Sequence, residues 1–124
     1  MKRDMDLVRN ILLAMEAEPS GDFNGRLCFE GYTSDQIGFH VIIMMQAGLI
    51  EGSDVTTYDS FGPEAIPTQM TWAGYDFLDA CRDEARWTKA KEIFNKAGGV
   101  TFDVAKEVLT SLMIKGVTQI LTPG

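Results

Sequence analysis

The chain has 124 residues, 45% of them hydrophobic and 23% charged, which excludes a disordered segment and suffices for one hydrophobic core. Its 11 lysine and arginine residues are outnumbered by 18 aspartate and glutamate residues, so the net charge is −7. This balance disfavours nucleic acid and anionic membrane surfaces as partners, because the chain repels other polyanions at long range.

Three features indicate a cytoplasmic protein without a membrane anchor. The unbroken apolar run from Val41 to Met45 has only five residues, whereas a membrane-spanning helix needs roughly 20. Asp4 and Asp6 precede every apolar run at the N-terminus, which argues against a signal peptide. Cys28 and Cys81 could form one bridge at most, so we expect reduced thiols rather than a disulfide framework.

The first half of the chain predicts a helix, a short strand and a second helix. Residues 4–16 place apolar side chains at three- and four-residue steps, which is typical of an amphipathic helix. After a loop, residues 27–29 favour a short extended piece. The sequence from Thr33 to Gln36 has the form of a capping box, so we expect a helix that runs through Ala47 and ends at Gly48.

The second half predicts a hairpin and three helices. Residues 49–51 and 55–58 favour extended structure, residues 60–63 break it, and residues 66–71 can return antiparallel. Pro67 requires an edge position or a bulge because it has no N–H to donate. Three capped helices are then expected: one from Thr71 to about Arg86, a short one from Thr88 to Gly98-Gly99, and one from Thr101 to Gly116.

The expected fold class is therefore α+β and mostly α. It has a winged-helix-like core made of a helix, a short strand, a helix and a β-hairpin wing, followed by three C-terminal helices. We expect a single domain over residues 1–124, with the core in 1–71 and the C-terminal helices of 72–116 packed on it. Residues 20–32 hold glycines and an extended stretch where a complete helix-turn-helix needs another helix.

Several sequence blocks carry a resemblance that covers nearly the whole chain. They are the opening MKRDMDLVR, the spacing from Tyr32 to His40, AGLIEG at 47–52, TWxGxxFLD at 71–79, and Arg82-Asp83 ahead of Trp87. With these blocks the chain resembles a family of small uncharacterised winged-helix-like proteins of bacteria and their prophages. The resemblance implies the fold and a bacterial or phage source, and it assigns no activity and no site residue.

A winged helix that reads DNA needs lysine and arginine on its recognition helix and wing. Between Arg26 and Arg82 the chain has neither residue type. The same interval holds eight acidic residues, namely Glu30, Asp35, Glu51, Asp54, Asp59, Glu64, Asp76 and Asp79. The predicted reading helix and wing are therefore acidic, and DNA binding there is disfavoured.

The second predicted helix is apolar on two faces. Opposite its core residues lie Phe39, Ile42 and Ile43 rather than the arginine and asparagine side chains that read bases. Such a face is either covered by the C-terminal helices or offered to a partner. We predict that Phe39, His40, Ile42, Ile43 and Gln46 form a candidate interaction surface.

Basic residues gather later in the chain, at Arg82, Arg86, Lys89, Lys91 and Lys96, where DNA could bind under an alternative reading. Acidic residues interleave with this basic cluster at spacings that favour local ion pairs on a solvated surface.

Three aspartates, Asp76, Asp79 and Asp83, fall on one helical side and could hold a metal ion or act as paired carboxylates. No other ligand converges there, and His40 is the single histidine, so we expect no zinc site and a structural role for His40. The chain has no nucleophile, phosphate-loop or cofactor motif. We therefore expect no catalytic residue, cofactor, metal or small-molecule ligand.

The sequence favours a non-enzymatic protein–protein interaction module of bacterial or prophage origin, with self-association through Phe39, Ile42 and Ile43 as one possible form. Two alternatives remain open. One is a DNA-binding transcriptional regulator that uses the region from Arg82 to Lys96. The other is a small metal-dependent hydrolase that uses the three aspartates.

Overall fold

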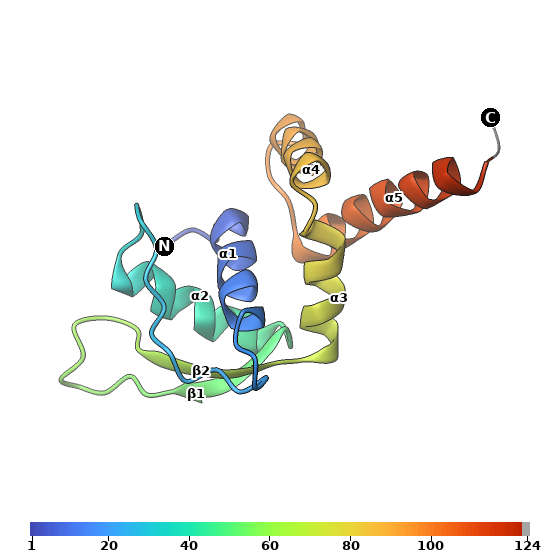
Figure 1. The fold of residues 1–124 in the computed structure, drawn as a ribbon. Helices are drawn as coiled ribbons and strands as arrows, with labels where there is room; N and C mark the ends of the chain where they lie inside the picture. Colours follow the sequence, from blue (N-terminus) through green and yellow to red (C-terminus); the bar gives the residue numbers. More distant parts are fainter. Residues whose placement is uncertain (123–124) are drawn as a thin grey trace. The chain divides into compact units, whose positions relative to one another are not determined.

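A computed structural model describes residues 1–122, and within that range it contains five helices and one antiparallel hairpin (Figure 1). In chain order the elements are α1 (Met5–Glu16), α2 (Ser34–Gln46), β1 (Ile50–Asp54), β2 (Ala65–Met70), α3 (Trp72–Cys81), α4 (Glu84–Lys96) and α5 (Phe102–Leu121). This is the α+β, mostly helical class that the sequence predicts. The last two residues of the predicted domain, 123 and 124, lie outside the described residues.

The chain divides into two compact units, Met1–Asp76 and Phe77–Gly124, and the division falls inside α3. In the first unit the buried apolar side chains come mainly from α1 and α2, and include Leu7, Ile11, Leu12, Val41 and Met44. In the second unit they come from the end of α3, from α4 and from α5, and include Leu78, Cys81, Trp87, Ala90 and Leu109.

Both ends of α2 form as the sequence predicts. The Thr33 hydroxyl accepts the Gln36 backbone N–H at 3.1 Å, and the Gln36 side chain accepts the Thr33 backbone N–H at 2.8 Å, which completes the capping box. At the other end Gly48 has φ +78, and Leu49 donates its N–H to the Met44 carbonyl at 3.0 Å. This is a Schellman motif, which turns the chain directly into β1.

The hairpin is irregular at the proline that the sequence singles out. Glu51 pairs with Gln69 whereas Gly52 pairs with Pro67, so one residue of β2 is left over and forms a bulge. The expected strand at 27–29 is absent among the described residues. Just before this segment, the Phe23 N–H donates to the Thr68 carbonyl of β2 at 2.6 Å. A single hydrogen bond does not make a strand.

The expected long helix from residue 72 to residue 86 is wrong, because α3 ends at Cys81. The Asp83 carboxylate accepts the Arg86 backbone N–H at 2.7 Å and so begins α4, and the prediction that Thr88 caps this helix is wrong. The Arg86 guanidinium in turn donates to the Ala80 carbonyl at 3.0 Å, at the end of α3. Asp83 and Arg86 therefore satisfy backbone groups at the start of α4 and at the end of α3, which stabilises the break between the two helices.

The last helix begins as expected and ends later than expected. The Thr101 hydroxyl accepts the Val104 N–H at 3.2 Å, which confirms the predicted cap. The expected end at Gly116 is wrong, because α5 continues to Leu121. A single glycine costs a helix only about 1 kcal/mol, and no proline or capping side chain stops α5 there. Phe102 packs on Phe77 with ring centroids 5.2 Å apart.

Candidate functional site

His40 holds α2 to the start of α1 from inside the core. Its side chain is 1% exposed. Its Nε2 accepts the Asp4 backbone N–H at 2.8 Å, and its Nδ1 lies 2.7 Å from the Gln36 carbonyl oxygen. Because Nε2 accepts, Nδ1 carries the proton and donates to Gln36, so the ring is the neutral Nδ1–H tautomer. The structural role expected for His40 is confirmed, and its place in the predicted interaction surface is wrong because the side chain is buried.

Asp4 extends this contact into a small polar network. Its carboxylate accepts the Leu7 N–H at 3.2 Å as the N-cap of α1, and its other oxygen accepts the Tyr32 hydroxyl at 3.0 Å. Burial raises the pKa of Tyr32, and the hydrogen bond to Asp4 and the negative charges of Asp4 and Asp6 act in the same direction. One aspartate thus connects α1, the loop before α2 and α2 itself.

The outer face of α2 is only partly covered. Phe39, Ile42 and Ile43 are half-buried, and Gln46 is exposed. The Phe39 ring meets the His40 ring edge-on, with centroids 5.6 Å apart. These four residues therefore leave a mixed apolar and amide surface on the protein, without the cationic side chains that a DNA-reading helix presents.

The hairpin loop, residues 55–64, is tied together by its own side chains. The Thr56 hydroxyl donates to the Glu64 carbonyl at 3.2 Å and accepts the Glu64 N–H at 3.0 Å. Thr57 donates its N–H to the Ser60 hydroxyl at 3.0 Å. At the base of the loop, hydrogen bonds from the side chain and backbone of Thr56 lower the pKa of Asp54. These hydrogen bonds give the loop a defined conformation.

Two aromatic side chains of this loop, Tyr58 and Phe61, are fully exposed. Val55, at the start of the loop, and Ile66, in β2 just after it, are exposed as well. Large apolar side chains that gather on a surface mark sites of contact with other molecules more often than single exposed residues do. The charged side chains of the hairpin and its loop are all acidic, because no lysine or arginine occurs from residue 27 to residue 81.

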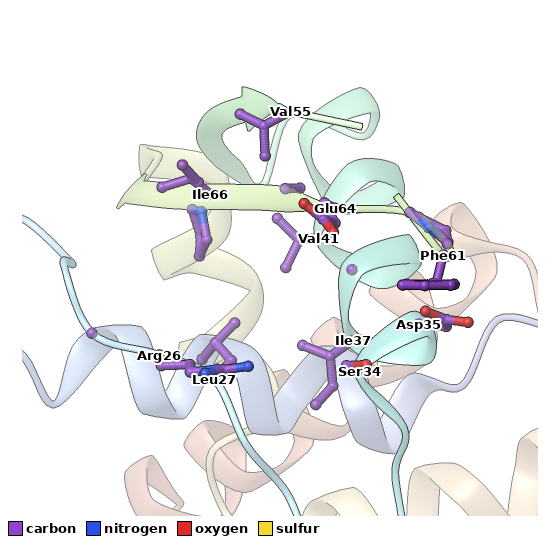
Figure 2. A pocket seen from close by; sticks show the side chains of 16 residues that line it. Arg26, Leu27, Ser34, Asp35, Ile37, Val41, Val55, Phe61, Glu64 and Ile66 are labelled. Atoms are coloured by element: carbon purple, nitrogen blue, oxygen red, sulfur yellow. The ribbon is translucent and has the colours of Figure 1, made fainter. Parts of the chain in front are cut away.

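A groove of about 580 Å³ lies between the hairpin, the first turns of α2 and the segment at residues 25–27 (Figure 2). Ile37 and Val41 of α2 are buried along it, whereas Phe61 and Ile66 are exposed. Its charged residues are Arg26, Asp35 and Glu64. Figure 2 shows Arg26 and Leu27 away from Asp35 and Phe61, so the cation and the Asp35 carboxylate stand at different ends.

The wall of the groove is held against α2 at a glycine. A Cβ atom on Gly38 would collide with the backbone carbonyl of Pro63. Only glycine allows the end of the hairpin loop to approach the helix so closely. On this side the groove is therefore bounded by two backbone segments in contact.

Two residues of the basic cluster, Arg82 and Arg86, make polar contacts within the second unit. Arg82 forms an ion pair with Asp79 at 2.7 Å. Arg86 donates to the carbonyls of Asp79 and Ala80 at the end of α3. Lys89 shares a shallow hollow with Glu84 and Glu92, while Lys91 and Lys96 lie on the same helix, α4. The five side chains do not form an unbroken cationic track, since acidic residues stand between them.

The three aspartates do not form a joint site in the described part of the chain. Asp83 is engaged as the N-cap of α4 and Asp79 as the partner of Arg82. No group of three or more histidine, cysteine, aspartate or glutamate residues among those described could hold a metal ion. None of the described helices is long and apolar enough for membrane crossing.

Comparison with known proteins identifies the family. The model of a family described as "Hypothetical protein (DUF2513)" matches residues 2–101. The chain belongs to this family. A Haemophilus influenzae protein described as "Uncharacterized protein" is 31% identical over an alignment of 117 residues, and the alignment covers 91% of this chain and 96% of the relative. No solved structure matches the chain.

The DUF2513 match extends from α1 to Thr101, the N-cap of α5. It therefore includes the His40 network, the hairpin loop and the groove. Tyr58 and Phe61 are not among the predicted surface residues, although two aromatic residues inside a turn segment rich in serine, glycine and proline are a usable signal. The groove has no comparable signal in the sequence, because it depends on how far residues 25–27 stand from β2.

Proposed function

We propose that this DUF2513 protein is a non-enzymatic protein-binding module whose contact surface is the hairpin loop. The observation that carries the proposal is the full exposure of Tyr58 and Phe61 on a loop that its own hydrogen bonds hold in shape. A loop held in shape in this way loses less backbone entropy on binding, and tyrosine is enriched at the centres of interfaces.

The acidic character of α2 and the hairpin favours a protein partner over nucleic acid. A duplex carries one phosphate charge per ~1.7 Å of its axis, and its affinity depends on cations that neutralise those charges. From residue 27 to residue 81 the chain offers none. The same field attracts a basic protein surface and would accelerate its association.

The outer face of α2 supplies a second contact in the proposal. Phe39, Ile42 and Ile43 are half-buried, so each has apolar area left to bury against another molecule. Self-association through these three residues is one form that the contact can take. A bacterial or prophage origin and a cytoplasmic setting complete the proposal, supported by the Haemophilus influenzae relative and by Cys28 and Cys81, which form no disulfide among the described residues.

The proposal is tested by comparing partner capture by variants of two exposed apolar sites. The wild-type chain, Tyr58→Asp and Phe61→Asp are immobilised and exposed to lysate of the source organism, and captured proteins are quantified by mass spectrometry. Ile120→Asp is the matched control, because Ile120 is 84% exposed in α5 and lies outside the family match. We expect a protein that binds the wild type and the control and is lost from both loop variants.

A titration with duplex DNA tests the principal alternative. We expect no change in the fluorescence anisotropy of a labelled random-sequence duplex at low salt. Binding that weakens steeply as salt is added, and that is lost in Arg82→Ala or Lys89→Ala, would contradict the proposal and favour a regulator that uses the basic cluster. Light scattering of the wild type and of Phe39→Ser and Ile43→Ser measures self-association directly.

A further inference from the structure

The groove in Figure 2 lies where β2 has a neighbour on one side only. β1 pairs along one edge of β2, and the sheet has two strands within the described residues. On the other edge the Phe23 N–H bonds to the Thr68 carbonyl, after which the chain separates from β2. The groove opens at that point, between residues 25–27 and residues 65–67. An unpaired edge of this kind accepts an added strand from another chain.

The interior of the groove can receive every second side chain of an extended segment. Buried Ile37 and Val41 offer an apolar surface from α2, and exposed Phe61 and Ile66 extend it outward. Successive residues of an extended segment point to opposite sides, so every second side chain of an occupant would reach this surface. The contact of Pro63 with Gly38 fixes the wall, which reduces the entropy that binding would cost.

The charge of the groove specifies what the remaining side chains of an occupant should be. Neither the Asp35 nor the Glu64 carboxylate forms an ion pair or accepts a side-chain hydrogen bond within residues 1–122. The nearby hairpin adds Asp54 and Asp59, and Arg26 is the one cation of the lining. An occupant with lysine or arginine side chains would neutralise these carboxylates, whereas an acidic one would be repelled.

We propose that this groove binds an extended segment of the partner protein in which basic residues alternate with apolar ones, and that the segment adds to the free edge of β2 as a third strand. The inference rests on the proposed function, since it names the chemistry of the partner. It assigns the apolar side chains of the segment to Ile37 and Val41, and its cations to Asp35 and Glu64.

The probe is a fluorescein-labelled peptide of about ten residues that alternates lysine and valine, a length typical of a strand. Anisotropy is measured on the full chain. We expect saturable binding that weakens between about 50 mM and about 200 mM NaCl, because the salt screens the exposed carboxylates. The same peptide with glutamate in place of lysine should not bind, and lysine–glycine peptide should bind more weakly.

Variants then locate the binding site. Asp35→Asn and Glu64→Gln should each weaken the lysine–valine peptide by about fivefold, the usual scale of a solvent-accessible ion pair. The control is Asp103→Asn, which removes the same charge from an exposed position of α5 outside the groove lining, and it should change the affinity by less than about twofold. N-methylation of alternate peptide bonds along one edge should abolish binding, since strand addition needs those N–H groups.

Backbone amide shifts in NMR spectra give an independent location. We expect the largest changes at residues 25–27, 37–41 and 64–67. The inference is overturned if the lysine–valine peptide does not bind, if the glutamate peptide binds equally, if the N-methylated peptide is unaffected, or if the shifts cluster elsewhere.

Failure of this inference and failure of the proposed function give different results. If the peptide does not bind while capture of a partner still depends on Tyr58 and Phe61, the hairpin loop binds protein and the groove does not. If the loop variants capture the same proteins as the wild type, the proposed function fails, whatever the peptide does.

Discussion

The two units of the chain differ in charge far more than the overall composition suggests. Residues 1–76 hold four lysine or arginine residues against twelve aspartate or glutamate residues, a net charge of −8. Residues 77–124 hold seven against six, a net charge of +1. The net charge of −7 thus belongs to the first unit. A composition averaged over a chain can conceal a surface with one sign of charge.

The units also use their polar residues differently. In the first unit a buried histidine and an aspartate connect separate elements, with His40 and Asp4 as partners 36 residues apart. In the second unit the polar contacts near the break between α3 and α4 are local, such as Arg82 with Asp79 and Arg86 with Asp83. We therefore expect single polar substitutions to cost more stability in the first unit than in the second.

The largest effect is expected for His40→Ala. The substitution leaves the Asp4 N–H and the Gln36 carbonyl without their side-chain partner and removes a fully buried ring, so it should lower the free energy of unfolding by about 3 kcal/mol. Urea denaturation followed by circular dichroism measures the change. Gln46→Ala, an exposed position at the end of the same helix, is the control and should cost less than about 0.5 kcal/mol. Similar losses in both variants would contradict the assigned role of His40.

Two helix glycines should respond in opposite directions to the same change. Gly38→Ala places a methyl group against the Pro63 carbonyl and should destabilise the protein by about 2 kcal/mol. Gly116→Ala meets no atom within 4 Å and should stabilise α5 by about 0.5–1 kcal/mol, because alanine has the higher helix propensity. Thermal unfolding of both variants measures the contrast. Stabilisation by Gly38→Ala would mean that the hairpin loop does not rest on α2 as described.

Local chemistry explains which elements the sequence predicts correctly. The caps at Thr33, Thr71 and Thr101 and the stop at Gly48 each depend on side chains within a few residues, and all four form as predicted. The break at Asp83 was missed because apolar residues continue at helical spacing across it. Only the joint action of Asp83 and Arg86 on two helix ends makes the break favourable.

The candidate site was less accessible to sequence analysis than the fold. Helical periodicity predicts that Phe39, Ile42 and Ile43 lie on an outer face of α2. A count of residues shows that α2 and the hairpin have no lysine or arginine. His40 was misplaced because periodicity cannot show that the Asp4 N–H reaches its ring from a distant part of the chain. The groove depends on the separation of residues 25–27 from β2, a tertiary property with no local signature.

The break between α3 and α4 offers a smaller test within the second unit. Asp83→Ala removes the N-cap of α4 and should lower the free energy of unfolding by about 1 kcal/mol. Glu107→Ala is the matched control, because Glu107 is an exposed acidic residue inside α5 without a capping role, and it should change stability by less than about 0.5 kcal/mol. Equal effects of the two variants in chemical denaturation would contradict the assignment of the cap.

The smallest effect concerns the pH dependence of the first unit. Burial, together with the hydrogen bond to Asp4 and the nearby negative charges, raises the pKa of Tyr32 in the folded state. A raised folded-state pKa means that the contribution of Tyr32 to stability is complete below the unfolded value of about 10 and is lost as the pH rises through the folded value. Stability of the wild type should therefore fall more steeply above about pH 10 than that of Tyr32→Phe. At neutral pH the variant should lose about 1 kcal/mol or less, the usual contribution of one hydrogen bond.

Tyr58→Phe is the control because the Tyr58 ring is fully exposed, and it should follow the wild type across the alkaline range. If Tyr32→Phe and the wild type lose stability in parallel, the phenol does not stabilise the fold through Asp4, and the link from Asp4 to the loop before α2 adds nothing to the contact that His40 makes from α2.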